Sequence, residues 1–335
     1  MGLVRVSSVK ILPPSIQFTF RLWEPSKNLS IWKSVPVHNF RVDEADRRSS
    51  SSDQFNISVS GDGTGDKYTL TGKYDKDVQI SLTFERRSEA FKLGMGPRGG
   101  MTYFGTLSDK APADANAPDT KAGSEGFVVH RFWPRCAVEG TAVVNGEPVD
   151  FAGTRGIFVH AIQGMRPNLV AARWNFANFH TVPTTEGEEE AALIMMEFTT
   201  TQNHGLKVVN VGCVVVGDKL VSVTCGGEGI PAGEGSDVQH IEPVKDAETG
   251  YNAPSKVVYT WRGKSLADAG DVHAELAVDL ITNKEPYETR GLVEKVDVLG
   301  QIPYIIKKFV NYAAGAKPFI YTVRRLYLCS LQPVS

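Results

Sequence analysis

Short runs of alternating hydrophobic and polar residues dominate this chain. Residues 15 to 22 (SIQFTFRL) place four large apolar side chains on one side of an extended segment and polar side chains on the other. Residues 77 to 86 (DVQISLTFER) repeat the pattern. A period of two is typical of a β-strand with one buried face. We therefore expect antiparallel β structure, and the apolar residues 4 to 12 indicate a further strand that starts almost at Met1.

The densest series of strand signals lies between residues 126 and 179. Asn145-Gly146 within it is the strongest short hairpin signal, because both central positions of a type I′ turn need positive φ. We expect strands on both sides of this turn and again over residues 156 to 162. A turn-rich bridge at residues 163 to 168 then leads into a strand over residues 169 to 179. The bridge is interpreted as the hinge between two similar halves.

A second series of strand signals follows the bridge, and one helix interrupts it near the end of the chain. Apolar residues recur at helical spacing from Ile302 onward, Pro303 stands where a first helical turn tolerates proline, and Gly315 ends the segment. Strands with one late helix are the plan of a lipocalin-like barrel, and 335 residues at ~150 residues per domain suggest two domains. Two complete barrels of about eight strands each would need rather more residues than this chain has. We predict an all-β fold: two consecutive lipocalin-like (calycin) β-barrels with one late amphipathic helix, over residues 1 to 163 and 164 to 335.

Composition and charge exclude several classes of function. A formal net charge of −2 provides no basic surface for nucleic acid, so we expect no nucleic-acid partner. The four cysteines are scattered without CxxC spacing, which favours reduced, buried thiols and a cytosolic compartment. Charged residues and prolines interrupt residues 1 to 22, so no signal peptide is expected there. No window reaches the ~20 apolar residues that a membrane-spanning helix needs.

The sequence contains no motif of a common catalytic or metal site. The seven histidines show no HExxH or paired Cys-His spacing, and no GxSxG motif is present. The glycine-dense residues 94 to 105 lack both the Gly-Lys-Ser/Thr ending and the GxGxxG register of a phosphate-binding loop. We predict no cofactor, no metal and no catalytic residue.

Large aromatic residues beside polar ones mark the candidate ligand site. Trp133 and Arg135, and again Trp174 and Asn175, can line the mouth of a barrel, where the rings contact an apolar ligand and the polar groups orient its head group. Met165 in the bridge completes the predicted set. The alternative is that both tryptophans only fill the barrels and that Arg135 caps a strand end. His130 and His160 are interpreted as structural residues.

Several longer motifs carry a resemblance to a known family. They include TYFG (102–105), HRFWPRCAVE (130–139), FVHAIQGM (158–165), RWNF (173–176), IMME (194–197), VVNVG (208–212), VDV (296–298) and AAGAKPFIY (313–321). In these motifs the chain resembles the fungal survival factor family over roughly residues 15 to 323. The resemblance implies two lipocalin-like barrels, a cytosolic protein of survival under oxidative stress, and a link to sphingolipid handling at internal membranes. The family's N-terminal membrane-touching segment has no counterpart, and residues 324 to 335 do not match its closing strands, so we expect both barrels to be incomplete.

These observations lead to three functional hypotheses. The first is non-enzymatic binding or transfer of a lipid-like ligand, such as a sphingolipid, by a cytoplasmic protein with peripheral contact to endoplasmic reticulum or Golgi membranes and presence in the nucleus. An eight-stranded barrel is just wide enough to hold one small ligand. The second is a two-barrel pericyclase or hydratase acting on a polyene, because shape and a few hydrogen-bond donors would suffice for that chemistry. The third is a stress-response scaffold whose barrels are filled by side chains.

Overall fold

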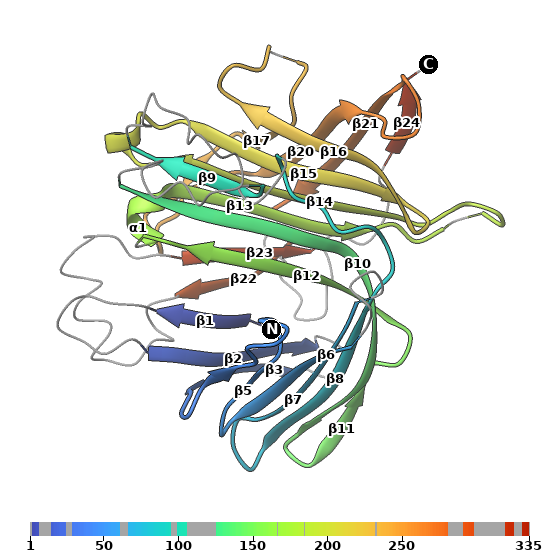
Figure 1. Cartoon of the computed structure of the whole chain (residues 1–335). Helices are drawn as coiled ribbons and strands as arrows, with labels where there is room; N and C mark the ends of the chain where they lie inside the picture. Colours follow the sequence, from blue (N-terminus) through green and yellow to red (C-terminus); the bar gives the residue numbers. More distant parts are fainter. Residues whose placement is uncertain are drawn as a thin grey trace, which may run out of the picture. The chain divides into compact units, whose positions relative to one another are not determined.

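The fold is seen in a computed structural model of the chain. It describes residues 2–6, 15–24, 29–60, 66–94, 99–105, 125–165, 167–183, 185–231, 233–280, 291–297, 319–324 and 330–334. The described residues are nearly all β, which confirms the predicted fold class (Figure 1). They fall into two compact units that are not continuous in sequence. The first unit comprises the described residues up to Arg87 and Cys136–Gly156, and the second comprises Ser88–Arg135, residues 157 to 280 and those from 291 onward.

The first unit is built from two antiparallel sheets. One contains β1 (Gly2–Val6), β2 (Ser15–Glu24) and β3 (Leu29–Pro36). The other is an up-and-down series of β4 (Arg41–Val42), β5 (Ser50–Ser51), β6 (Phe55–Ser60), β7 (Lys67–Lys73), β8 (Val78–Arg86), the end of β10 (Gly126–Val144) and β11 (Glu147–Asp150). This strand order is that of lipocalin-like architectures. The strand expected near Met1 is confirmed as β1, which pairs with β2.

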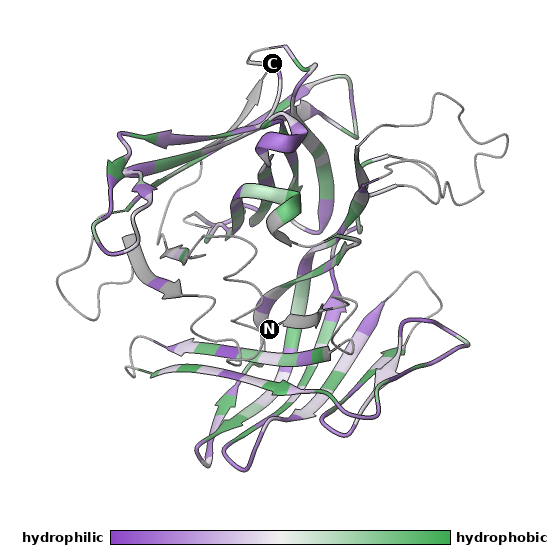
Figure 2. Cartoon of the chain, turned by 90° about the vertical axis from the view of Figure 1, so that its left-hand side faces the viewer, coloured by the Kyte–Doolittle hydropathy of each residue, from purple (hydrophilic) through white to green (hydrophobic). Residues whose placement is uncertain are grey.

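The hairpin signal at Asn145-Gly146 is confirmed. Val144 pairs with Glu147, and the two turn residues have φ values of 53° and 86°. The period of two in β8 is also confirmed, since Val78, Ile80 and Leu82 are buried. The side chains of Val78 and Ile80 join a cluster of buried residues that includes Phe18, Phe55 and Tyr74. Strands of both units carry alternating hydrophobic and hydrophilic positions (Figure 2).

The second unit contains several smaller antiparallel sheets. One consists of β13 (Ala171–His180), β14 (Ala191–Thr200), β15 (Val208–Val216) and β16 (Lys219–Gly227), and another of β17 (Asp237–Ile241), β20 (Lys256–Lys264), β21 (Asp271–Asp279) and β24 (Ser330–Val334). β9 (Met101–Phe104) and β12 (Thr154–Gln163) pair with β10. The two-stranded pairs are β18 (Val244–Lys245) with β19 (Asn252–Ala253) and β22 (Gly291–Asp297) with β23 (Phe319–Arg324).

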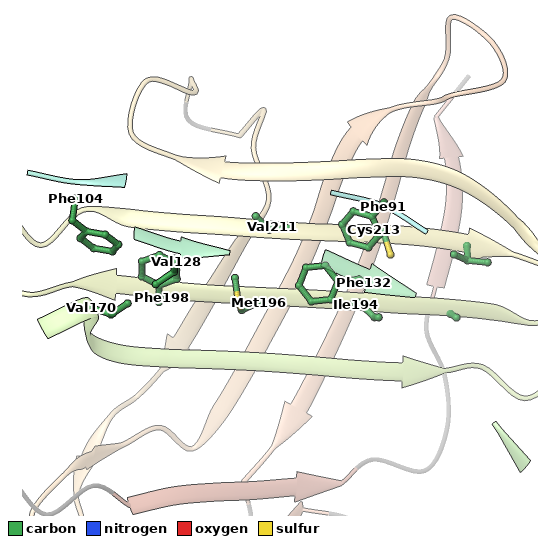
Figure 3. Packing of buried hydrophobic residues seen from close by; sticks show 12 residues of the cluster. Phe91, Phe104, Val128, Phe132, Val170, Ile194, Met196, Phe198, Val211 and Cys213 are labelled. Atoms are coloured by element: carbon green, nitrogen blue, oxygen red, sulfur yellow. The ribbon is translucent and has the colours of Figure 1, made fainter. Parts of the chain in front are cut away.

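β14 is an inner strand of its sheet, and its two sides pack into two different clusters of buried residues. The side chains of Ala192, Ile194, Met196 and Phe198 enter cluster 1, together with residues of β9, β10 and β15 (Figure 3). Leu193 and Met195 enter cluster 2, with residues of β15, β20 and β21. Because both sides of β14 are covered, its sequence AALIMMEFTT is almost continuously apolar.

Several elements differ from the sequence-based expectations or lie outside the described residues. β10, the strand expected before the Asn145-Gly146 turn, has 19 residues and continues through Pro134. Residues Pro167–Val170 form a single helical turn, α1, where we expected the start of a strand. A second short turn, of 3₁₀ type, covers Gln202–His204. The late amphipathic helix predicted from Ile302 to Gly315 lies outside the described residues.

The predicted domain boundary is not the border between the compact units. Residues 163 and 164 both belong to the second unit, so the boundary between residues 1–163 and 164–335 stays a prediction. Residues Ser330–Val334, which the family motifs do not cover, form β24 and pair with β21. Within the described ranges, no helix has the length and apolar character needed to cross a membrane.

Candidate functional site

Two partly exposed aromatic side chains lie at the edge of cluster 1. Trp174 and Phe176 are two residues apart on β13 and therefore point to the same side of the strand. They are 39% and 48% exposed, although their cross-strand partners Phe198 and Met196 are buried. The ring centroids of Trp174 and Phe198 are 4.8 Å apart. The surface formed by these two rings is thus continuous with the buried cluster beneath it.

Residues of β12 and the segment after it pack against the same cluster. Ile157, Val159 and Met165 are partly buried there. Gly126 leaves room for Met165, since a Cβ at this glycine would lie 2.9 Å from the Met165 sulfur. We call Trp174, Phe176, Ile157, Val159 and Met165 together the apolar rim. Aromatic rings and a flexible thioether suit contact with a long hydrocarbon chain.

His130 is a polar residue set among the aromatic rings of cluster 1. It lies between Val128 and Phe132 on β10, on the side that faces the cluster, and is only 6% exposed. Its ring centroid is 6.2 Å from that of Trp174 and 6.4 Å from that of Phe198. Burial lowers the pKa of His130 to about 4. The imidazole is therefore neutral near pH 7.

We expect His130 to make the folded protein sensitive to acid. Its folded pKa of about 4 lies below the ordinary value of 6.5, so its contribution to stability is complete above pH 6.5 and is lost as the pH falls toward 4. By pH 5 this loss amounts to about 2 kcal/mol. Urea unfolding of the wild type and of His130→Gln at pH 7.5 and pH 5 measures it: the wild type should lose about 2 kcal/mol more than the variant between the two pH values. Equal losses in both proteins would contradict the burial of a neutral His130.

Asn175 lies on the opposite side of β13 from Trp174, in a row of polar residues across three strands. Asn175, Glu197 and Asn210 are direct cross-strand partners on β13, β14 and β15. Glu197 is 2% exposed, and its carboxylate accepts hydrogen bonds from Asn175 Nδ2 at 3.2 Å and Asn210 Nδ2 at 3.0 Å. The backbone N–H of Val238, on β17, donates to it at 3.1 Å. The carboxylate therefore connects the β13–β16 sheet to the β17–β24 sheet.

This polar row extends to His240, whose Nε2 lies 2.9 Å from Asn175 Oδ1. Burial raises the pKa of Glu197, and the hydrogen bonds from the two asparagines and Val238 oppose that effect. A depression of about 480 Å³ opens beside Glu197 and is lined by residues 205 to 208, 227 to 228 and 236 to 237. Because the Asn175 amide is already bonded on both sides, its predicted contact with a ligand head group stays a prediction.

Trp133 and Arg135 make contacts with residues outside the apolar rim. Trp133 is 7% exposed and packs against Phe158, with ring centroids 5.0 Å apart. Arg135 Nη2 lies 2.7 Å from Glu190 Oε2, its Nε is 3.4 Å from Asp218, and its Nη1 donates to the carbonyl of Gly217. These contacts hold the strand ends around β14–β16 together.

Of the five predicted site residues, two pack against the same cluster. Met165 and Trp174 both pack at cluster 1, whereas Trp133, Arg135 and Asn175 each belong to a different set of contacts. Sequence reasoning missed Phe176, although the period of two that places Trp174 on one side also places Phe176 there. It treated Glu197 only as part of a family motif. A single charge in the run AALIMMEFTT was the available signal.

The described residues offer no candidate metal centre, since no group of three or more His, Cys, Asp or Glu side chains gathers among them. Of the cysteines, Cys136 and Cys213 are buried and free, and Cys225 is exposed and free. Burial raises the pKa of the Cys136 thiol to about 12, so it is protonated and unreactive at neutral pH.

Comparison with known proteins places the chain in a family. The model of the Svf1 family matches residues 2–327. The ceramide-binding protein svf1 of Aspergillus fumigatus is 35% identical over 293 residues, which are 88% of this chain and 62% of that protein. The ceramide-binding protein SVF1 of Eremothecium gossypii is 32% identical over 323 residues, 94% of this chain and 72% of that protein.

The chain thus spans less than two thirds of the Aspergillus relative. Among solved structures, an AttH protein of Nitrosomonas europaea is 12% identical with a TM-score of 0.46, covering 82% of this chain and 80% of that one. The family resemblance expected from the sequence is confirmed by the family model, and this chain belongs to the Svf1 family.

Proposed function

We propose that this chain binds a ceramide-like long-chain lipid at the apolar rim and does not convert it chemically. The observation that carries the proposal is the pair Trp174 and Phe176, which remain 39% and 48% exposed directly over the buried side chains of cluster 1. Large aromatic side chains exposed together over a core mark ligand or partner contact more often than isolated ones do. The names of the Aspergillus and Eremothecium relatives, ceramide-binding proteins, support a lipid ligand and describe binding rather than a reaction.

The energetic basis of the proposal is the removal of apolar surface from water. Each buried CH₂ group of a ligand chain contributes about 0.8 kcal/mol. A chain that covers the rings of Trp174 and Phe176 also removes their exposed faces from water. The rim residues of β12 and Met165 are themselves partly buried and add contact surface to the same cluster. A neutral lipid suits the apolar rim, because His130 in the adjoining cluster is uncharged near pH 7.

Replacement of Trp174 by alanine tests the proposal. We expect Trp174→Ala to weaken binding of a fluorescent short-chain ceramide by about tenfold, the equivalent of 1.4 kcal/mol. The affinity is measured by titrating the purified full chain into the probe and following fluorescence. Leu266→Ala is the matched control, since Leu266 is an apolar residue of the same unit that is 60% exposed. Unchanged affinity in a folded Trp174→Ala protein, or an equal loss in Leu266→Ala, would remove the rim as the binding site.

The cellular role belongs to the same proposal. A protein that binds a ceramide-like lipid reversibly can carry it between membranes, and we propose that such transfer, at endoplasmic reticulum and Golgi membranes, supports survival under oxidative stress. The measurement is transfer of a fluorescent ceramide between donor and acceptor vesicles, with and without the protein. A transfer rate equal to that of the protein-free vesicles would argue against a carrier and for binding alone.

A further inference from the structure

The side chain of His130 is an unusual polar group for its position. Its contacts within the described residues are with aromatic rings: Phe132 with a centroid distance of 6.4 Å, Phe198 at 6.4 Å and Trp174 at 6.2 Å. Among the described residues no hydrogen bond to its ring nitrogens is found, although the residue is only 6% exposed. Ring nitrogens that have no protein partner within the described ranges can form hydrogen bonds with a ligand.

The backbone fixes this side chain in place. The His130 N–H donates to the Gly100 carbonyl at 2.8 Å, and the period of two along β10 directs the ring to the cluster 1 side, between Val128 and Phe132. The imidazole lies edge-on to the ring of Trp174, with an interplanar angle of 67°. It is therefore next to a residue of the apolar rim. A ligand lying over Trp174 therefore passes close to the imidazole.

We infer that His130 recognises the head group of the bound lipid through a hydrogen bond. It selects a neutral head group with hydroxyl or amide groups. This inference rests on the proposed function and adds a specificity-determining residue to it. A neutral imidazole has one nitrogen that donates and one that accepts a hydrogen bond. It can therefore satisfy a hydroxyl or an amide of the ligand, and the ligand can satisfy the imidazole.

A charged head group does not suit the same place. The rings of Phe132, Phe198 and Trp174 around His130 cannot solvate a phosphate, and burial keeps the imidazole from supplying a positive charge near neutral pH. A lipid with a bare hydrocarbon end fits the rings but leaves the imidazole without a partner. The site should thus prefer a neutral, hydrogen-bonding lipid over both alternatives.

Three probes that differ only in their polar end test the inference. These are a fluorescent short-chain ceramide, the same ceramide carrying a 1-phosphate, and a fluorescent hydrocarbon without a head group, each titrated with the full chain. For the wild type we expect the ceramide to bind at least tenfold more tightly than the ceramide phosphate. In His130→Phe we expect ceramide affinity to fall by about tenfold, as for loss of one hydrogen bond in an apolar site, with hydrocarbon affinity unchanged. His130→Gln, which keeps a donor and an acceptor, should recover part of the ceramide affinity.

The outcomes separate the inference from the proposed function. His160→Phe on β12 is the control, because this histidine is exposed, and it should bind all three probes like the wild type. If His130→Phe binds ceramide and hydrocarbon as the wild type does, or if the wild type binds the phosphate as tightly as the ceramide, then His130 does not read the head group, while lipid binding stands. If the wild type binds neither ceramide nor hydrocarbon, the proposed function fails and the inference fails with it.

Discussion

Replacement of Glu197 by leucine is expected to lower the free energy of unfolding by about 4 kcal/mol. Leucine has a similar volume but accepts no hydrogen bond. The change leaves the side-chain amides of Asn175 and Asn210 and the N–H of Val238 without their acceptor inside the unit. Each buried donor left without a partner costs about 1 to 3 kcal/mol, and relief from burying a charge offsets part of the sum. Urea unfolding followed by tryptophan fluorescence measures the change.

A second variant at this position shows whether hydrogen bonding causes the loss. Glu197→Gln keeps one acceptor oxygen for the donors of Asn210 and Val238 but turns its NH₂ group toward the Asn175 amide donor. We therefore expect it to lower the free energy of unfolding by about half as much as Glu197→Leu. The matched control is Glu275→Leu, which replaces an exposed glutamate on β21. A Glu197→Leu protein as stable as the wild type would show that the polar row does not hold the two sheets together. Glu197 would then become a candidate for ligand contact through the depression beside it.

Replacement of Arg135 by methionine is expected to cost about 3 kcal/mol of stability and to leave ceramide binding unchanged. The guanidinium of Arg135 and the carboxylate of Glu190 have side-chain exposures of only 17% and 12%, with an Nη2 to Oε2 distance of 2.7 Å. Removing the cation removes the hydrogen bonds that Arg135 donates to this carboxylate and to the Gly217 carbonyl. Methionine retains most of the apolar stem of the arginine, so packing changes little.

A double-mutant cycle tests whether the ion pair is the cause. Glu190→Gln alone should cost less, because Arg135 keeps the Gly217 carbonyl and Asp218. The double variant Arg135→Met with Glu190→Gln should be more stable than the sum of the single losses predicts, since no charge is then left buried. The opposite pattern, a stable Arg135→Met protein that no longer binds ceramide, would return Arg135 to the ligand site expected from the sequence.

The candidate site could be predicted in part. Aromatic residues in a β-rich chain suit apolar ligands, which predicts a site at Trp174, and the structure leaves this residue 39% exposed at the edge of cluster 1. Adjacency in sequence suggests Asn175 as a second residue of the same site. Adjacent residues of a strand point to opposite sides, so the same period of two that predicted the strand argues against that grouping. Phe176, two positions from Trp174, points to the same side of β13 and is therefore the better candidate for the same site.

The partners of Arg135 and Glu197 could not be predicted. The Arg135 contact with Glu190 spans 55 positions of sequence, and the Val238 N–H reaches Glu197 from a strand 41 positions away. No local pattern encodes such pairs, because they depend on which strands the folded sheets bring together. The surroundings of His130 could not be predicted for the same reason. Its aromatic surroundings come from three different strands.

The sequence by itself determined the β class, the position of the Asn145-Gly146 hairpin and the family, because alternation, turn chemistry and long motifs are local properties of the chain. Tertiary structure alone decided which side chains are exposed and which are bonded. It buried Trp133 and left Trp174 at the surface, tied Arg135 into an ion pair, and enclosed Glu197 between two sheets. The physical reason is that burial and hydrogen bonding depend on neighbours brought together from distant positions, which only the packed sheets define.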